Sequence, residues 1–364
     1  MLVLATFLTA VFPPLLLTGF FLTQYRRRLG LRLGIAAFGL GILAAGTALL
    51  LARMVQYSGL FPLATKLDSA RDAVAQALLT AGVYAAIPEE LAKFLMVWFV
   101  IKRSKDCDSG GDLFCGAILV SLGFAALENV LYVAPQHEPM RWAIVGFVRS
   151  VMAIPGHTID GMFMGYFLAL WWRKALPHWL ALLLALVLPM AAHAFYDFPL
   201  IALDILARQP ELAALHLPLI EWLRFMQFGV MGVSALGAIW VARQELVEVF
   251  HDAVPDGDLY AADGNALRYW RWVGWGMAGF GALIGGFGIA IFFADAPMRF
   301  AADGMTRGFP ELSRWLVWLF YRQTGEFLFG LALFPLAFGA ILQMRPPVRI
   351  ENLFALWPTA RPWS

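Results

Sequence analysis

Three ionisable side chains lie inside a long apolar run, and their types suit proton-transfer chemistry. Glu89, Glu90 and Lys93 interrupt the apolar stretch 73–101. A charge at membrane depth costs roughly 2.5–3.5 kcal/mol on insertion scales, so such charges are rare and usually functional. On a helix, Glu89 and Lys93 share a face, whereas Glu90 points about 100° away. This spacing favours a Lys93–Glu89 pair beside a carboxylate that faces a cavity. The alternative is an ion pair that only joins two helices.

Further polar groups interrupt the next three apolar runs of the chain. They form three short motifs: Phe124-Ala-Ala-Leu-Glu128-Asn129, His157-Thr-Ile-Asp160-Gly161 and His193-Ala-Phe-Tyr-Asp197, with Arg149 upstream of the second. Counted from the ends of their runs, these groups can reach one level in the outer half of a membrane. Each has a plainer interpretation, since a lone His or Asn can join two helices and His193 can simply pair with Asp197. Their joint occurrence on four consecutive runs favours a single site.

This set of residues suits hydrolysis of a peptide bond without a covalent nucleophile. A carboxylate that is partly desolvated and faces a cation can serve as a base that takes a proton from water. A neighbouring His can orient that water or protonate the leaving amine, and the amide of Asn129 can donate to an oxyanion. Two His and a carboxylate with an open position are also a catalytic zinc set. We expect no tightly bound transition metal, because Lys93 competes for the carboxylate, and we expect Glu128 to hydrogen-bond to a histidine.

The composition identifies a membrane protein with several spans. Hydrophobic residues make up 61% of the 364 and charged residues only 14%, with a mean hydropathy of +0.71. Soluble domains have roughly 45–50% apolar and 25% charged residues. A net charge of +2 gives no indication of nucleic-acid binding. The expected partners are the lipid bilayer and a substrate protein embedded in it.

The apolar runs predict an all-α, polytopic transmembrane bundle with about nine spans. The predicted spans are 2–25, 33–52, 73–101, 113–134, 142–172, 178–199, 219–242, 272–293 and 315–343. Eight spans are the alternative, because Pro155 can mark a re-entrant turn. In the second span, Ala37, Gly41 and Ala45 recur every four residues and predict close helix packing.

The distribution of Arg and Lys predicts the orientation. These residues are more frequent in one alternate set of loops, which places the N-terminus outside and the C-terminus in the cytoplasm. The enriched set is 26–32, 102–111, 173–177, 243–271 and the C-terminal tail. We divide the chain into two N-terminal helices with an outer loop (1–72), a four-helix catalytic core (73–200), and C-terminal helices with a tail (201–364).

The four motifs together resemble those of the PrsW family of intramembrane proteases, which is related to the type II CAAX prenyl endopeptidases and the CPBP family. The resemblance covers about residues 73–200, and the motifs occur in the same order on consecutive spans. Glu128 stands where the prenyl endopeptidase branch has a His, and this difference favours PrsW. The spans on either side are not informative.

The resemblance implies a glutamate-dependent endopeptidase of a bacterial plasma membrane. Glu89 and Glu90 would activate water, with His157 and His193 assisting, and the substrate would be a membrane-anchored regulator such as an anti-sigma factor. Our candidate catalytic residues are Glu89, Glu90, Lys93, Glu128, Asn129, His157, His193 and Asp197, with no cofactor required.

Besides a catalytically inert binding or scaffold protein of the same fold, two alternatives remain open. The first is a zinc-dependent intramembrane metalloprotease whose ligands come from His157, His193, Glu89, Glu90 and Glu128. The second is a proton-coupled transporter, although transporters tend to show internal repeats with paired broken helices, which this sequence lacks.

Overall fold

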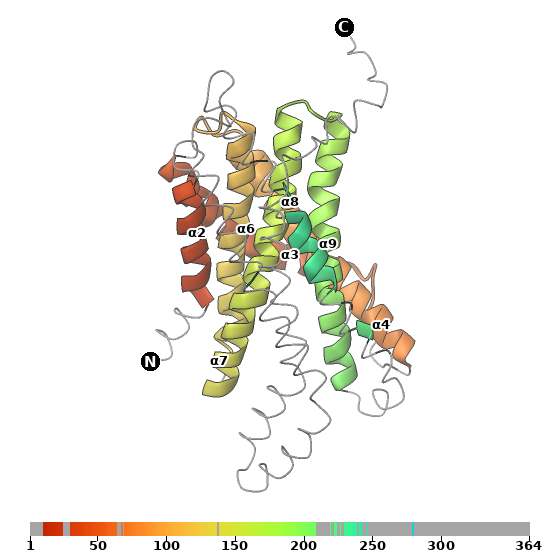
Figure 1. Cartoon of the computed structure of the whole chain (residues 1–364). Helices are drawn as coiled ribbons and strands as arrows, with labels where there is room; N and C mark the ends of the chain where they lie inside the picture. The colour runs from red at the N-terminus through yellow and green to blue at the C-terminus, as the bar shows by residue number, and fades with distance from the viewer. Residues whose placement is uncertain are drawn as a thin grey trace. The chain divides into compact units, whose positions relative to one another are not determined.

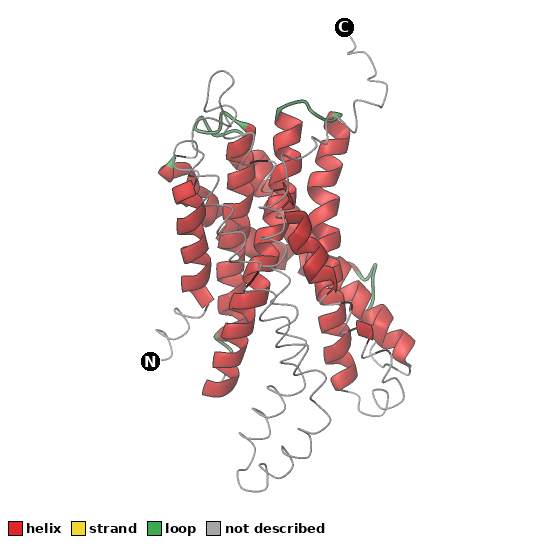
Figure 2. Ribbon diagram, in the orientation of Figure 1, coloured by secondary structure: helices red, strands yellow, loops and turns green. Residues whose placement is uncertain are grey.

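The computed structural model describes the part of the chain that contains all four motifs. Every element in that part is helical (Figure 2), as the apolar runs predict. The chain divides into two compact units, residues 1–227 with 349–364 and residues 228–348. The described residues are 10–24, 30–63, 67, 69–136, 138–208 and 229–238, with isolated positions at 219, 222, 223, 226, 240, 241, 245 and 279.

Figure 1 shows the elements of the first unit, coloured in chain order. Segments written η are π-helical. In chain order the elements are α2 (Phe12–Gln24), α3 (Leu31–Ser58), α4 (Ala70–Leu79), η2 (Thr80–Ala86), α5 (Ile87–Met96), η3 (Val97–Ile101), α6 (Gly110–Val133), α7 (Pro139–Val148), η4 (Arg149–Ala153), α8 (Ile154–Trp172) and α9 (His178–Ala207).

Local capping fixes where several helices begin and end. Ser109 precedes α6 and accepts from the Asp112 N–H at 3.2 Å, while the Asp112 carboxylate accepts from the Ser109 N–H at 2.9 Å. This reciprocal capping box satisfies two backbone donors that a helix start leaves unpaired. Gly59 ends α3 with a left-handed φ of 67°, a conformation that glycine adopts without steric cost.

Three uninterrupted helices in the described part are long and apolar enough to cross a membrane. They are Leu31–Ser58, Gly110–Val133 and His178–Leu206, which correspond to the predicted second, fourth and sixth spans. The first predicted span is described only from residue 10. Of the seventh, isolated positions and a helix at Gly229–Ala238 are described. Of the eighth span only residue 279 is described, and the ninth lies outside the described residues, so nine spans and their orientation stay predictions.

The third and fifth predicted spans are continuous helical paths with π-helical turns inside them. Residues 70–101 pass through α4, η2, α5 and η3, and residues 139–172 pass through α7, η4 and α8. Pro88 and Pro155 stand at the starts of α5 and α8, each directly after a π segment. Proline removes one backbone donor, and a π turn upstream accommodates that loss. The alternative of a re-entrant turn at Pro155 is therefore wrong, because the helix continues through it.

Two predicted loop boundaries also need correction. Helix α9 continues to Ala207 rather than ending at residue 199, and α3 continues to Ser58 rather than residue 52. The extension of α9 has a packing cause. Its residues Phe198, Ala202 and Leu206 bury themselves against Ala73 and Ala77 of α4, so the helix persists past Pro199 to cover that face.

Glycines let the central helices approach backbone to backbone. Helix α6 packs against α3 and α8, and α8 packs against α9 (Figure 1). A side chain at Gly41 of α3 would collide with the Val120 carbonyl oxygen of α6, and one at Gly165 of α8 would lie 2.7 Å from the Phe114 Cα. The predicted small-residue face is confirmed, since Ala37 and Ala45 are buried beside Gly41.

This crossing predicts different outcomes for two glycines of the same helix. Gly41→Ala should lower the melting temperature in detergent, because the backbone of α6 cannot yield as a flexible side chain would; overpacking typically costs about 1–3 kcal/mol. Gly39→Ala is the matched control, since a Cβ there meets nothing within 4 Å and alanine is the better helix former. Equal melting temperatures for the two variants would contradict the packing described.

Candidate active site

A fully buried ion pair lies at the start of α5. Lys93 Nζ is 2.7 Å from Glu90 Oε1, and neither side chain is exposed. The predicted Lys93–Glu89 pairing is therefore wrong. Residues three apart on a helix can meet as well as residues four apart, so Glu90 can pair with Lys93. Both side chains face the protein interior, where the centre of the Phe124 ring lies 4.2 Å from the ammonium. Glu89 is 17% exposed and is left without this partner.

His157 of α8 connects the ion pair to α6. Its Nδ1 lies 3.0 Å from Lys93 Nζ, and its Nε2 lies 2.6 Å from Glu128 Oε2. An ammonium group can only donate, so Nδ1 accepts and Nε2 carries the proton that it donates to Glu128. The predicted hydrogen bond between Glu128 and a histidine is confirmed, and His157 is held as the neutral Nε2–H tautomer.

His193 of α9 lies among carboxylates. Its Nδ1 is 2.8 Å from Glu90 Oε1, and its Nε2 is 3.2 Å from Asp197 Oδ2 and 3.8 Å from Glu89 Oε2. With these carboxylates ionised, both ring nitrogens donate, which describes an imidazolium. The ring lies 5.5 Å from that of His157 at an interplanar angle of 79°. The two histidines therefore differ in protonation: one is neutral, and the other can give up a proton.

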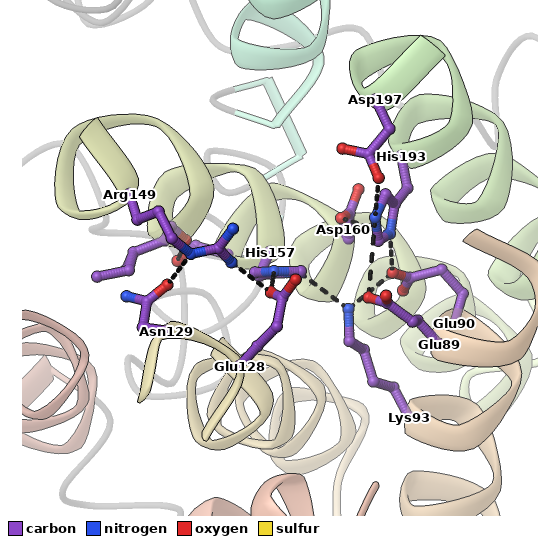
Figure 3. A network of polar contacts seen from close by, with 12 residues as sticks. Glu89, Glu90, Lys93, Glu128, Asn129, Arg149, His157, Asp160, His193 and Asp197 are labelled. Atoms are coloured by element: carbon purple, nitrogen blue, oxygen red, sulfur yellow. Dashed lines mark hydrogen bonds and ion pairs between the residues drawn. The ribbon is translucent and has the colours of Figure 1, made fainter. Parts of the chain in front are cut away.

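The network continues from Glu128 to the first residue of η4. Arg149 Nη2 is 2.7 Å from Glu128 Oε2, and Arg149 Nε donates to Asn129 Oδ1 at 2.7 Å. The Asn129 amide nitrogen donates to the Ala10 carbonyl at 3.4 Å. Figure 3 shows Asn129 beside Arg149, at the end of the network away from Glu90. Among the described residues, no contact supports the predicted oxyanion role of Asn129.

The structure thus brings all eight candidate residues into one connected network from α5, α6, α8 and α9 (Figure 3). Two members were not assigned by sequence reasoning. Arg149 contacts Glu128, and Asp160 Oδ2 lies 3.8 Å from His193 Nδ1. Both are charges within an apolar run and were noted as such in the sequence, but neither was chosen as a candidate catalytic residue.

Burial divides the network into an enclosed part and an accessible edge. Glu90 and Lys93 are fully buried, and the two histidines are almost so. Glu128, Arg149 and Asp197 are 15–25% exposed, as is Glu89. Among the described residues, Glu89 Oε2 and Glu90 Oε2 are buried oxygens without a hydrogen-bond partner. A buried carboxylate oxygen without a partner is costly, so these two atoms mark where a ligand or water would be stabilised.

Comparison with known proteins agrees with this geometry. Residues 30–223, more than half of the chain, match the model of a family described as "PrsW family intramembrane metalloprotease". The chain belongs to the PrsW family. The matched region contains every side chain of the network described above. No solved structure matches.

Curated proteins named Protease PrsW are similar to this chain over about a third of its length. That of Oceanobacillus iheyensis is 34% identical over 117 residues, which are 31% of this chain and 50% of the relative. That of Bacillus subtilis is 33% identical over 122 residues, 32% of this chain and 51% of the relative. The chain therefore spans about half the length of the curated relatives that it matches.

The PrsW family description implies a metal, and the residues present can be tested for it. Glu90, His157, Asp160 and His193 offer ligand atoms that all lie within 4.8 Å of one another. Two imidazoles with carboxylates are a donor set that catalytic zinc uses, and Glu90 Oε2 has no other partner. The set therefore fits zinc. Lys93 is bonded to two of these residues, so its ammonium would have to leave His157 Nδ1 before that atom could ligate.

The buried pair predicts a strong effect of removing Lys93. Lys93→Met should lower the stability by about 3–5 kcal/mol, because it leaves Glu90 charged, buried and without its cation. Adding Glu90→Gln should recover part of that loss, since residues in direct contact are not additive. Thermal unfolding of the two single variants and the double variant measures this coupling. Lys105→Met, at an exposed position, is the control. Full additivity of the two substitutions would contradict the pairing.

Proposed function

We propose that this chain is an intramembrane endopeptidase in which Glu89 activates water to cleave a peptide bond of a membrane-embedded protein. The observation that carries the proposal is the contrast between two adjacent carboxylates. Glu90 is bonded to Lys93 and His193 through one oxygen, whereas Glu89 has no hydrogen bond among the described residues and lies at the accessible edge. A general base needs a free lone pair within reach of water, so Glu89 suits that role better than Glu90.

The other residues divide the remaining work. In the proposed reaction Glu89 takes a proton from water, whose oxygen adds to the scissile carbonyl carbon. His193, which lies 3.8 Å from Glu89, then gives a proton to the amine as the carbon–nitrogen bond breaks. The proton held by Glu89 restores that of His193, which balances the cycle. Glu90 and Asp197 hold the His193 ring from both sides.

Zinc is the alternative within the same site. When bound, it would lower the pKa of a water ligand and polarise the scissile carbonyl. Glu90, His157, Asp160 and His193 would hold it, and Glu89 would remain available as a base at the accessible edge. Lys93 supports the metal-free version, because it already places a positive charge between Glu90 and His157.

The substrate proposal rests on the family and on where the residues lie. The network is built on helices that include two of spanning length, α6 and α9, so a substrate must reach it from the bilayer or its surface. The finer proposal, a membrane-anchored regulator such as an anti-sigma factor in a bacterial plasma membrane, follows from the resemblance to PrsW proteins.

Glu89→Gln tests the proposed base, because it keeps the shape of the side chain but accepts no proton. Proteolysis should fall by about 100-fold or more, the usual worth of a positioned base. Cleavage can be measured without a known substrate by labelling the new N-termini that appear in bacterial membrane proteins. The amounts found with the native chain and without it are compared. Glu138→Gln, outside the network, is the control. Undiminished cleavage by Glu89→Gln would overturn the assignment of the base.

Metal analysis of purified protein, combined with activity after chelation, distinguishes the two versions of the site. We expect substoichiometric zinc and activity that survives chelation, because Lys93 occupies part of the donor set. Stoichiometric zinc, with activity lost on its removal and restored by zinc alone, would make His157 and His193 ligands. In that case the metal-free version is wrong.

A further inference from the structure

Arg149 makes three contacts to a single stretch of α6. Its Nη2 lies 2.7 Å from Glu128 Oε2, and its Nε donates to Asn129 Oδ1 at 2.7 Å. The guanidinium carbon lies 4.0 Å from the centre of the Tyr132 ring. The partners stand at positions i, i+1 and i+4 of one helix, so a single planar guanidinium contacts side chains along a full helical turn. A guanidinium offers several donors in a fixed plane and also stacks on rings, and a lysine cannot match that geometry.

One oxygen atom joins this contact to the proposed active site. Glu128 Oε2 accepts from Arg149 Nη2 and also lies 2.6 Å from His157 Nε2. The other nitrogen of the same ring accepts from Lys93, which pairs with Glu90. The direction in which Glu128 points therefore determines how the His157 ring is turned. Without Arg149, the Glu128 carboxylate would keep one partner and could rotate toward its accessible side.

The position of Arg149 in the chain means that this contact also fixes the backbone just before the helix that carries His157. It is the first residue of the π turn η4, directly upstream of Pro155 and of the helix that carries His157. π turns within α-helices are frequently found at functional sites. Here the guanidinium fixes the start of such a turn to α6, and α6 supplies the carboxylate that receives His157.

We propose that Arg149 is a positioning residue, which holds the Glu128 carboxylate against His157 and thereby fixes the ring that faces Lys93. The inference rests on the proposed peptidase function for its kinetic consequence. Its structural consequence can be observed without any substrate.

The substrate-free test is nitrogen NMR of the full chain in lipid bilayers with ¹⁵N-labelled histidine. His157→Gln identifies the His157 signals by their loss. Arg149→Gln should move the His157 Nε2 resonance and leave those of His193 nearly unchanged, since His193 makes no direct contact with Arg149 or Glu128 in the structure. Arg103→Gln, a cation over Phe99 outside the network, is the control and should move neither. An unchanged His157 signal in Arg149→Gln would overturn the inference.

The kinetic test uses the substrate processing described above and a double-mutant cycle. Arg149→Gln should lower kcat by about tenfold with KM changed less than threefold, and Arg149→Lys should recover only part of it. In a Glu128→Gln background the loss caused by Arg149→Gln should shrink below threefold, because the two act through one contact. An equally large loss in that background, together with a lowered melting temperature, would reduce Arg149 to a structural role.

The two hypotheses fail in different ways. If Glu89→Gln abolishes cleavage while Arg149→Gln leaves kcat and the His157 resonance unchanged, only the role of Arg149 is wrong. If Glu89→Gln has no effect but the His157 resonance moves in Arg149→Gln, the positioning contact is real and the proposed base is wrong.

Discussion

The buried pair between Glu90 and Lys93 is the interaction on which the rest of this structure depends. Two charges without exposed surface are stable only when each has its partner and further hydrogen bonds. Here His157 of α8 accepts from the ammonium, and His193 of α9 donates to the carboxylate. The pair therefore holds α8 and α9 against α5. Buried charges are costly unless they have partners, and here the partners come from α8 and α9. The need to supply these partners therefore determines which helices pack around α5.

The helical breaks and the close helix crossings place these groups. Pro88 and Pro155 each follow a π segment. Glu89 is the next residue after Pro88, and His157 lies two residues after Pro155. The crossing of α6 with α8 is close enough that a side chain at Gly161 would lie 2.9 Å from a backbone oxygen of α6. Close approach of those two backbones is what brings Glu128 within hydrogen-bond distance of His157. Irregular backbone and small residues thus carry out one task, the placing of polar groups between apolar helices.

Much of the site could be predicted from the sequence because charges inside apolar runs are conspicuous. Glu89, Glu90, His157 and His193 were identified by this criterion, and the structure brings them together. The partner of Lys93 was predicted wrongly, because spacing along one helix offers both Glu89 and Glu90. Contacts of the Lys93 ammonium with Phe124 and His157, which lie on other helices, place it beside Glu90 rather than Glu89. Tertiary neighbours of this kind cannot be read from the spacing of one segment.

The same distinction explains the errors in the fold. The apolar run 113–134 located α6 to within a few residues, and the local capping box of Ser109 and Asp112 explains why the helix begins slightly earlier, at Gly110. The extension of α9 past Pro199 depended instead on burial against α4, a contact between segments more than 100 residues apart. The role expected for Asn129 failed to find support for a similar reason, because Arg149 and Ala10 engage its amide from other elements.

The most direct measurement of the central claim is an experimental structure of the full chain in lipid at a resolution that shows ordered water. The account predicts a water within hydrogen-bond distance of Glu89 Oε2 and close to the His193 ring, with Lys93 still between Glu90 and His157. A Glu89 carboxylate turned away from His193 and hydrogen-bonded to other groups of the protein would contradict it.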